Sequence, residues 1–109
     1  MTIDFLSVPE QAMEHFKGGE NTTFARMFFD GRTRIMQTRL PVGASIGEHT
    51  HETNCEVMYI LSGEAKVIFD GQEERILPGQ SHYCPKGRTH TTISAGSEDL
   101  VMFCVVAEQ

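Results

Sequence analysis

Three histidines and one glutamate have the residue types and spacing of a metal site. His49 and His51 are separated by one residue, and in an extended strand this spacing puts both imidazoles on one face, about 6.7 Å apart. Glu56 follows after a short loop, and a turn there would bring its carboxylate beside them. His90 lies in a second strand-like run, after the turn Pro85-Lys86-Gly87. This mixed nitrogen and oxygen ligand set suits iron, manganese, cobalt, nickel or zinc better than calcium or magnesium.

The spacing of these residues matches two known motifs. They are Gly43-x5-His49-x-His51-x4-Glu56-x6-Gly63, over residues 43–63, and Gly79-x5-Pro85-x-Gly87-x2-His90-x3-Ser94, over residues 79–94. Both resemble the paired motifs of the cupin superfamily, and the short spacer at 64–78 resembles that of small single-domain microbial cupins. Ser94 stands where the second motif usually has asparagine, which puts a structural hydrogen bond in doubt but no ligand.

The resemblance implies a cupin jelly-roll β-barrel, also called a double-stranded β-helix, with a metal inside it. The implied ligands of one divalent ion (Fe, Mn, Ni, Co or Zn) are His49, His51, Glu56 and His90. Free coordination positions would let the metal act as a Lewis acid, activate water or bind dioxygen. We therefore expect a metal-dependent enzyme, an oxygenase, an isomerase or epimerase, or a lyase or decarboxylase. Its substrate would be small and polar, with a carboxylate or carbonyl group. The alternative is a cupin module that binds a small ligand without catalysis.

No residue besides these four is an unambiguous acid or base. His82, Tyr83 and Cys84 lie in a strand that should approach the site, and alternation sends Tyr83 to the face opposite the other two. Which face lines the cavity is open, so His82 and Tyr83 are both candidate catalytic or substrate-contacting residues, with surface or packing roles as the alternative. Arg26 and Arg39 also lie in strands, where a buried arginine could hold an anionic substrate.

Short runs rich in β-branched and aromatic residues alternate with turn signals along the chain. The runs cover residues 22–29, 33–40, 55–61, 64–69, 72–77, 88–93 and 100–106. Strands of this length and spacing predict an all-β sandwich or barrel with little helix. Asp70-Gly71, between two runs, predicts a two-residue hairpin. Residues 9–16 are the one helix candidate, with Ser7 as a possible cap, and a strand or coil is an equal alternative there.

Length and composition limit the remaining possibilities. The 109 residues predict one domain over 1–109. A net charge of −6 argues against a nucleic-acid partner, and no run approaches the roughly 18 apolar residues of a membrane helix. Three cysteines without a framework spacing indicate reduced thiols and a cytoplasmic location. We also expect a homodimer, in which residues 22–29 and 100–106 pair or pack across a two-fold axis.

Overall fold

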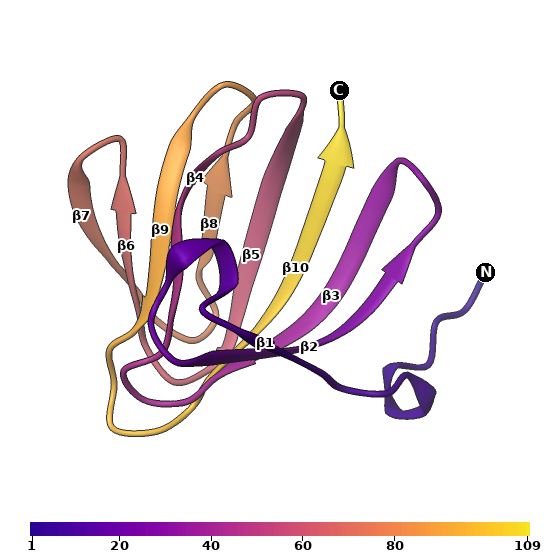
Figure 1. Cartoon of the computed structure of the whole chain (residues 1–109), viewed down its shortest axis with the longest axis horizontal. Helices are drawn as coiled ribbons and strands as arrows, with labels where there is room; N and C mark the ends of the chain where they lie inside the picture. The colour runs from indigo at the N-terminus through magenta and orange to yellow at the C-terminus, as the bar shows by residue number, and fades with distance from the viewer.

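The structure is a computed structural model that describes residues 1–109, and two antiparallel sheets face each other in it (Figure 1). The larger sheet has the strand order β1-β2-β3-β10-β5-β8, and the smaller has the order β4-β9-β6-β7. The strands are β1 (Gln11–Glu14), β2 (Thr22–Phe29), β3 (Thr33–Leu40), β4 (Ser45–Thr50), β5 (Asn54–Ser62), β6 (Ala65–Phe69), β7 (Gln72–Ile76), β8 (Ser81–Cys84), β9 (Thr89–Ser94) and β10 (Leu100–Glu108). With 59% strand and 6% helix, the chain has the predicted all-β jelly-roll fold.

Strand β5 shows how alternation in the sequence builds the interior. Met58 and Ile60 point inward and are almost fully buried, whereas Tyr59 between them is exposed on the outer face. Both buried residues belong to a twelve-residue apolar core to which the two sheets contribute. Glu56 has the same parity and is also buried, although it is charged. The interior therefore has an apolar part and, at the end where β5 begins, a polar part.

Half of the segment considered for a helix at residues 9–16 is a strand. β1 pairs with β2 from Gln11 opposite Ala25 to Glu14 opposite Thr22, because sheet pairing supplies backbone hydrogen bonds that so short a helix could not. Helix is limited to two three-residue 3-10 turns, η1 (Phe5–Ser7) and η2 (Phe16–Gly18). Neither has the length or apolar character needed to cross a membrane.

The predicted hairpin at Asp70-Gly71 is confirmed. It joins β6 to β7, and both turn residues have positive φ angles, 47° for Asp70 and 83° for Gly71. Two successive positive φ angles are the property of a type I′ turn, which matches the twist of the strands that it connects. At the outer edge of this sheet β7 carries exposed charged residues, which discourage edge-to-edge pairing.

The two segments expected to form a dimer differ in how much of their edges is free. β10 lies between β3 and β5 in the centre of the larger sheet, so it cannot extend the sheet into a second copy by backbone pairing. β1 covers the outer edge of β2 only over residues 22–25, and residues 26–29 have no neighbouring strand on that side. Contact between copies could therefore use this short edge of β2 or side chains on the outer face of the larger sheet.

Candidate metal centre

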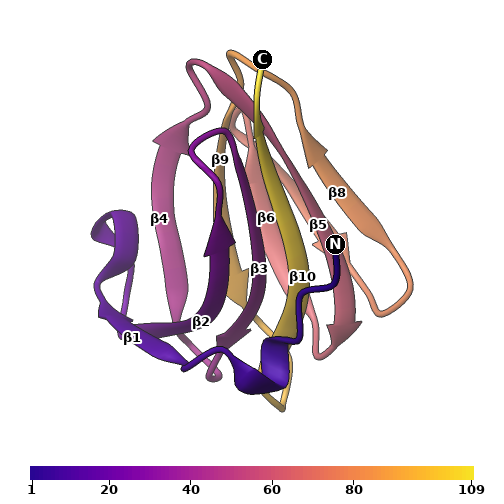
Figure 2. The same ribbon diagram turned by 90° about the vertical axis from the view of Figure 1, so that its right-hand side faces the viewer.

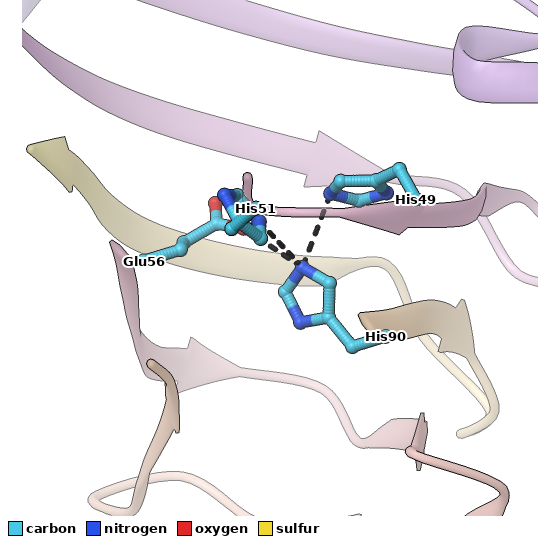
Figure 3. Close-up of side chains that lie close together, drawn as sticks. All are labelled: His49, His51, Glu56 and His90. Carbon is cyan, nitrogen blue, oxygen red and sulfur yellow. Dashed lines mark hydrogen bonds and ion pairs between the residues drawn. The ribbon is translucent and has the colours of Figure 1, made fainter. Parts of the chain in front are cut away.

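The four residues predicted as ligands lie together inside the barrel (Figure 3). We call them the donor cluster: His49, His51, Glu56 and His90. The Nε2 atom of His90 is 3.1 Å from Nε2 of His49 and 3.0 Å from Nε2 of His51. The Oε1 atom of Glu56 is 3.1 Å from Nε2 of His90 and 3.2 Å from Nε2 of His51. Four potential ligand atoms therefore converge on one small volume.

A bulge in β4 turns its two histidines toward the interior. Ile46 lies opposite Thr92 on β9, but His49 lies opposite His90, so β4 has one more residue than its partner between these pairs. The extra residue reverses the parity of the strand after Gly47. Without the bulge, the inward row begun by Ile46 would continue to Glu48, and both histidines would point outward.

The other ring nitrogens of His49 and His51 are already hydrogen-bonded. Nδ1 of His49 is 2.8 Å from the carbonyl oxygen of Gly47, and Nδ1 of His51 contacts Oδ1 of Asn54. Since both partners are acceptors, each Nδ1 carries the hydrogen, and in the neutral ring each Nε2 keeps its lone pair. These lone pairs and the Glu56 carboxylate face one another, so a metal ion between them would relieve the repulsion. Without a metal, a proton on Nε2 of His51 does the same by donating to Glu56.

The second motif also holds His51 in place through its backbone. The amide N–H of Gly87 donates to the carbonyl oxygen of His51 at 2.6 Å, and the N–H of His51 donates to the carbonyl of Arg88 at 3.0 Å. Gly87 has a φ of 87°, a left-handed conformation that a residue with a side chain would adopt only at a cost. The turn that leads to His90 is thus bonded to the loop that carries His51.

A chain of hydrogen bonds supports His90 from behind. Its Nδ1 is 3.1 Å from Nε2 of His82, and Nδ1 of His82 is 3.4 Å from a carboxylate oxygen of Glu74 at the surface. His82 is only 3% exposed, and it does not line the cavity beside the donor cluster. Tyr83 points to the opposite face and is 53% exposed. Of the two catalytic candidates, His82 contacts a ligand candidate from behind, and Tyr83 faces away from the cavity.

Electrostatics within the cluster keep its carboxylate charged. Burial raises the pKa of Glu56, but hydrogen bonds and charge interactions with His51 and His90 outweigh burial and lower the pKa to about 2. The hydrogen bond with Glu56 raises the pKa of His51 above its ordinary value, despite burial. Burial lowers the pKa of His49. At neutral pH the cluster therefore combines a carboxylate with imidazoles, a suitable donor set for a divalent transition metal.

The spacing of the donor atoms also fits a metal. Metal–nitrogen bonds are about 2.1 Å long, so two ligands at right angles around one ion lie roughly 3.0 Å apart. The four closest separations in the donor cluster are 3.0–3.2 Å. One ion could therefore contact all four donors with little movement of the side chains.

Metal affinity is expected to fall as the pH decreases through about 6.5, the ordinary pKa of histidine. The pKa of His51 is raised, so its proton begins to compete with the metal at a higher pH than that of an ordinary histidine. Glu56, with a pKa of about 2, stays ionised over this range and contributes nothing to the change. Ni²⁺ titrations from pH 5.5 to 8 would measure the dependence, and a flat profile would contradict it.

We expect His82→Phe to weaken metal binding about tenfold, since outer partners of ligating histidines typically contribute 10- to 100-fold. The substitution keeps a ring in place but removes the hydrogen bond to His90. Tyr83→Phe, on the opposite face of β8, is the matched control and should change nothing. Ni²⁺ titration of both variants measures this, and wild-type affinity in His82→Phe would contradict the supporting role. Full metal content with lost activity would instead make His82 a catalytic or substrate-positioning residue.

Ser94, which stands where the motif usually has asparagine, forms no side-chain hydrogen bond, as the sequence led us to expect. The Ser94 side chain is buried, and its hydroxyl oxygen has no hydrogen-bond partner. Its backbone is still tied to the start of β4, because the Ser94 N–H donates to the carbonyl of Ala44 and the Ser94 carbonyl accepts from Gly43. The side-chain hydrogen bond is therefore absent, and backbone hydrogen bonds alone join Ser94 to Gly43 and Ala44.

A cavity of about 420 Å³ adjoins the donor cluster. Three members of the cluster line it, all except His90. Arg26 and Arg39 do not line it: Arg26 donates to the carbonyls of Phe5 and Val8, and Arg39 pairs with Glu10 and Asp99. Their roles are therefore structural, because these partners hold the N-terminal segment and a surface loop against the larger sheet.

Some residues around the site were not predicted from the sequence. Lys17 and Arg34 line the cavity, Asn54 contacts the ligand candidate His51, and Glu74 contacts His82 behind His90. The role of Asn54 could have been predicted from the sequence, since the side chain of a polar turn residue three positions after His51 can reach the His51 ring. Arg34 shares the inward parity of Met36 in β3, which is also visible in the sequence. Lys17 and Glu74 had no such signal, because their positions depend on how η2 and β7 pack.

Comparison with known proteins agrees with the resemblance to cupins seen in the sequence. A family model described as Cupin domain matches residues 36–106. The chain is 34% identical over 112 residues to the oxalate-binding protein of Thermotoga maritima, covering 97% of this chain and 93% of that protein. It is 32% identical over 62 residues to the quercetin 2,3-dioxygenase of Bacillus subtilis, covering 57% of this chain but 18% of that enzyme. A crystal structure of a predicted oxalate decarboxylase from T. maritima matches over 100% of both chains, with a TM-score of 0.93 and 23% identity, a likeness of fold.

Proposed function

Because the chain belongs to the cupin domain family, we propose that it binds one divalent transition metal and acts as a metal-dependent enzyme on a small carboxylate- or carbonyl-bearing substrate. The metal ligands would be the donor cluster, with iron, manganese, nickel, cobalt or zinc as the ion. One observation carries this proposal: the Nε2 atoms of three histidines and a buried carboxylate converge, with neighbouring donor atoms 3.0–3.2 Å apart. A cation is the partner that such an arrangement lacks.

The bound metal would supply Lewis acidity and open coordination positions. The chain itself orients the ligands: the Gly47 carbonyl and Asn54 fix the hydrogen positions on His49 and His51. Glu56 contributes a full negative charge at neutral pH. The cavity brings a substrate to the side of the cluster that is lined by His49, His51 and Glu56. His90 does not line the cavity, and its Nδ1 atom contacts His82 on the opposite side.

The substrate class is supported by the relatives. One curated relative is an oxalate-binding protein and another is a quercetin 2,3-dioxygenase. Oxalate chelates a metal through carboxylate oxygens, and a dioxygenase uses open metal positions for dioxygen. For this chain we therefore propose an organic acid or carbonyl compound as ligand, with oxygenase, isomerase or epimerase, and lyase or decarboxylase chemistry as the reaction classes.

A second candidate function is binding without catalysis. The observation in its favour is the cavity wall: outside the donor cluster, its polar residues are threonines, an asparagine, a lysine and an arginine, with no further histidine or carboxylate. His82 is shielded from the cavity, so it cannot donate a proton directly to a bound molecule. A ligand-binding cupin needs only the pocket and the metal, and the name of the T. maritima relative is consistent with that role.

Metal analysis of protein purified without chelator, followed by a turnover assay, separates the two functions. We expect about one transition metal per chain. The metal-loaded protein is then incubated with oxalate, in air and without oxygen, and the products are followed by NMR. Consumption of oxalate in the wild type but not in His49→Ala would support an enzyme. Oxalate binding without turnover would favour the binding module, and protein without metal after reconstitution would contradict both.

We propose further that residues 1–109 form one cupin domain and that it functions in the cytoplasm as a homodimer. None of the three cysteines is in a disulfide, and all are buried, consistent with a reducing location. The outer face of the larger sheet supports a dimer, because exposed apolar residues lie side by side on β5, β8 and β10. This outer apolar patch consists of Val57, Tyr59, Leu61, Tyr83 and Phe103. Contiguous exposed patches of this kind mark interaction sites.

Sedimentation velocity is expected to give a mass near twice the 12.2 kDa of the chain. Tyr59→Glu should shift the protein toward the monomer, because Tyr59 is in register with Phe103 within the outer apolar patch and a charge there would be buried in the interface. Gln72→Glu, on the exposed hairpin of the other sheet, should leave the dimer intact. A concentration-independent mass near 12 kDa for the wild type would contradict the dimer.

A further inference from the structure

We infer that the cavity binds an elongated organic anion, whose chelating end lies at the metal and whose second anionic group is held by Arg34. Between the two ends, the ligand would have an apolar body several carbon atoms long. This inference rests on the proposed metal site and narrows its substrate class. It distinguishes such a ligand from oxalate, which is too short to reach both ends.

The charges of the cavity wall favour an anion. The chain has a net charge of −6, but the cavity is lined by two cationic side chains, Lys17 and Arg34, and by a single carboxylate, Glu56. Glu56 is committed to the donor cluster, where a divalent metal would neutralise it. Neither cation forms an ion pair with an acidic residue of the chain. Both positive charges therefore remain available to a ligand.

The sheet register places Arg34 away from the donor cluster. Val106 of β10 lies opposite Arg34 of β3 on one side and opposite Glu56 of β5 on the other. The three residues form one row across neighbouring strands and all line the cavity. With strands about 4.8 Å apart, the Cα atoms of Arg34 and Glu56 are separated by about 10 Å. The guanidinium also packs 4.2 Å from the ring centre of Phe29, which supports its position at the rim.

Lys17 reaches the cavity from η2, which lies against β4 (Figure 2). Lys17 has a left-handed φ of 57°, an unfavourable conformation for a lysine, and Gly18 follows with 81°. The segment is held by close backbone packing, since an added Cβ at Gly47 would lie 2.1 Å from the Lys17 carbonyl. The fold thus keeps this lysine in a strained turn beside the strand that carries His49, where its charge favours the anionic group of a ligand that binds the metal.

The remaining wall suits a ligand with an apolar body. Eight of the 18 lining residues are hydrophobic, including the flexible side chains of Met13, Met27 and Met36 and the ring of Phe16. The cavity volume of about 420 Å³ has room for a ligand larger than oxalate. Oxalate has six non-hydrogen atoms and no apolar part, so it would leave most of this space and the apolar wall unused.

One buried hydroxyl points to an additional polar contact. Thr23 lines the cavity, is 0% exposed, and its Oγ1 atom has no hydrogen-bond partner in the chain. An unsatisfied buried hydroxyl is costly, and a ligand oxygen would satisfy it. Thr23 lies on β2, next to β3, which carries Arg34. This position is consistent with a polar group along the ligand as well as at its ends.

Calorimetric titration of the Ni²⁺-loaded protein with three probes tests the inference. Oxalate is a short dianion, 2-oxoadipate is a long dianion with a chelating end, and 2-oxohexanoate has the same length but a methyl group in place of the distal carboxylate. Charge-assisted hydrogen bonds contribute about 1.5–3 kcal/mol, so 2-oxoadipate should bind at least about tenfold tighter than 2-oxohexanoate. It should also bind tighter than oxalate, which has the same charge.

Two variants complete the test. Arg34→Gln should reduce the preference for 2-oxoadipate over 2-oxohexanoate and leave oxalate binding unchanged, whereas Arg32→Gln, an exposed arginine outside the cavity wall, should keep the preference. Equal affinity for the two long probes, tighter binding of oxalate, or a preference that survives Arg34→Gln would overturn the inference alone. Metal content is measured on the same samples, and protein that takes up no Ni²⁺ would overturn the proposed function and this inference with it.

Discussion

His90→Ala is expected to lower the affinity for Ni²⁺ by more than about 100-fold, since loss of even an outer partner of a ligand costs 10- to 100-fold. The Nε2 atom of His90 is within 3.0–3.1 Å of a donor atom from every other member of the donor cluster. No neighbouring side chain can replace it, because His82 lies on the other side of the ring. Competition with a calibrated chelator measures the change.

The remaining members of the cluster should follow the same pattern. His49→Ala and His51→Ala should also lose metal, and Glu56→Gln, which keeps a carbonyl oxygen, should lose less affinity than Glu56→Ala. His15→Ala is the control, because the His15 ring hydrogen-bonds to the Gly19 carbonyl and does not line the cavity. Circular dichroism should show intact strand content throughout. Full metal occupancy in all three histidine variants would contradict the site and leave the family likeness as information about the fold.

Gly47→Ala is expected to destabilise the protein by about 1–3 kcal/mol or more, the range for inserting atoms into a packed region. The added Cβ would lie 2.1 Å from the Lys17 carbonyl oxygen and 2.7 Å from the Gly19 amide nitrogen, both backbone atoms that cannot rotate away. The structure can accept the methyl group only if η2 moves off β4. Urea unfolding of the metal-free protein measures the loss.

The same substitution should weaken metal binding, because the Gly47 carbonyl accepts the hydrogen bond that orients His49. We expect a loss of about tenfold, as for other outer partners of a ligand. Glu48→Ala, an exposed position next in the strand, is the matched control for both measurements. Wild-type stability in Gly47→Ala would show that η2 is not packed against β4 as described.

The strands and ligand candidates were predictable because they depend on local patterns. The expected strands at 22–29 and 33–40 agree with β2 and β3 residue for residue, since turn residues bound both runs. Asp70-Gly71 specified its hairpin through the positive φ angles that these residues tolerate. The ligand candidates were identified by spacing that matches a family, and the structure brings all four together.

What could not be predicted depends on contacts between distant segments. The bulge in β4 is visible only through its pairing with β9, and it decides which way His49 and His51 point. The strand at Gln11–Glu14 exists because β2 is there to pair with it. Lys17 lines the cavity only because two glycines, Gly19 and Gly47, allow η2 to approach β4. None of these features leaves a periodic signal in the sequence.

The most direct test is a crystal structure of the metal-loaded protein, with the ion identified by anomalous scattering. The donor cluster predicts one ion per chain, bonded to the Nε2 atoms of three histidines and to the carboxylate of Glu56. A second group of potential ligands, His82, Cys84 and His90, lies on the other side of the His90 ring. Burial raises the pKa of Cys84 to about 11, which disfavours the thiolate that a metal needs. An ion bound by that group, or no ion after loading with metal, would contradict the proposed centre.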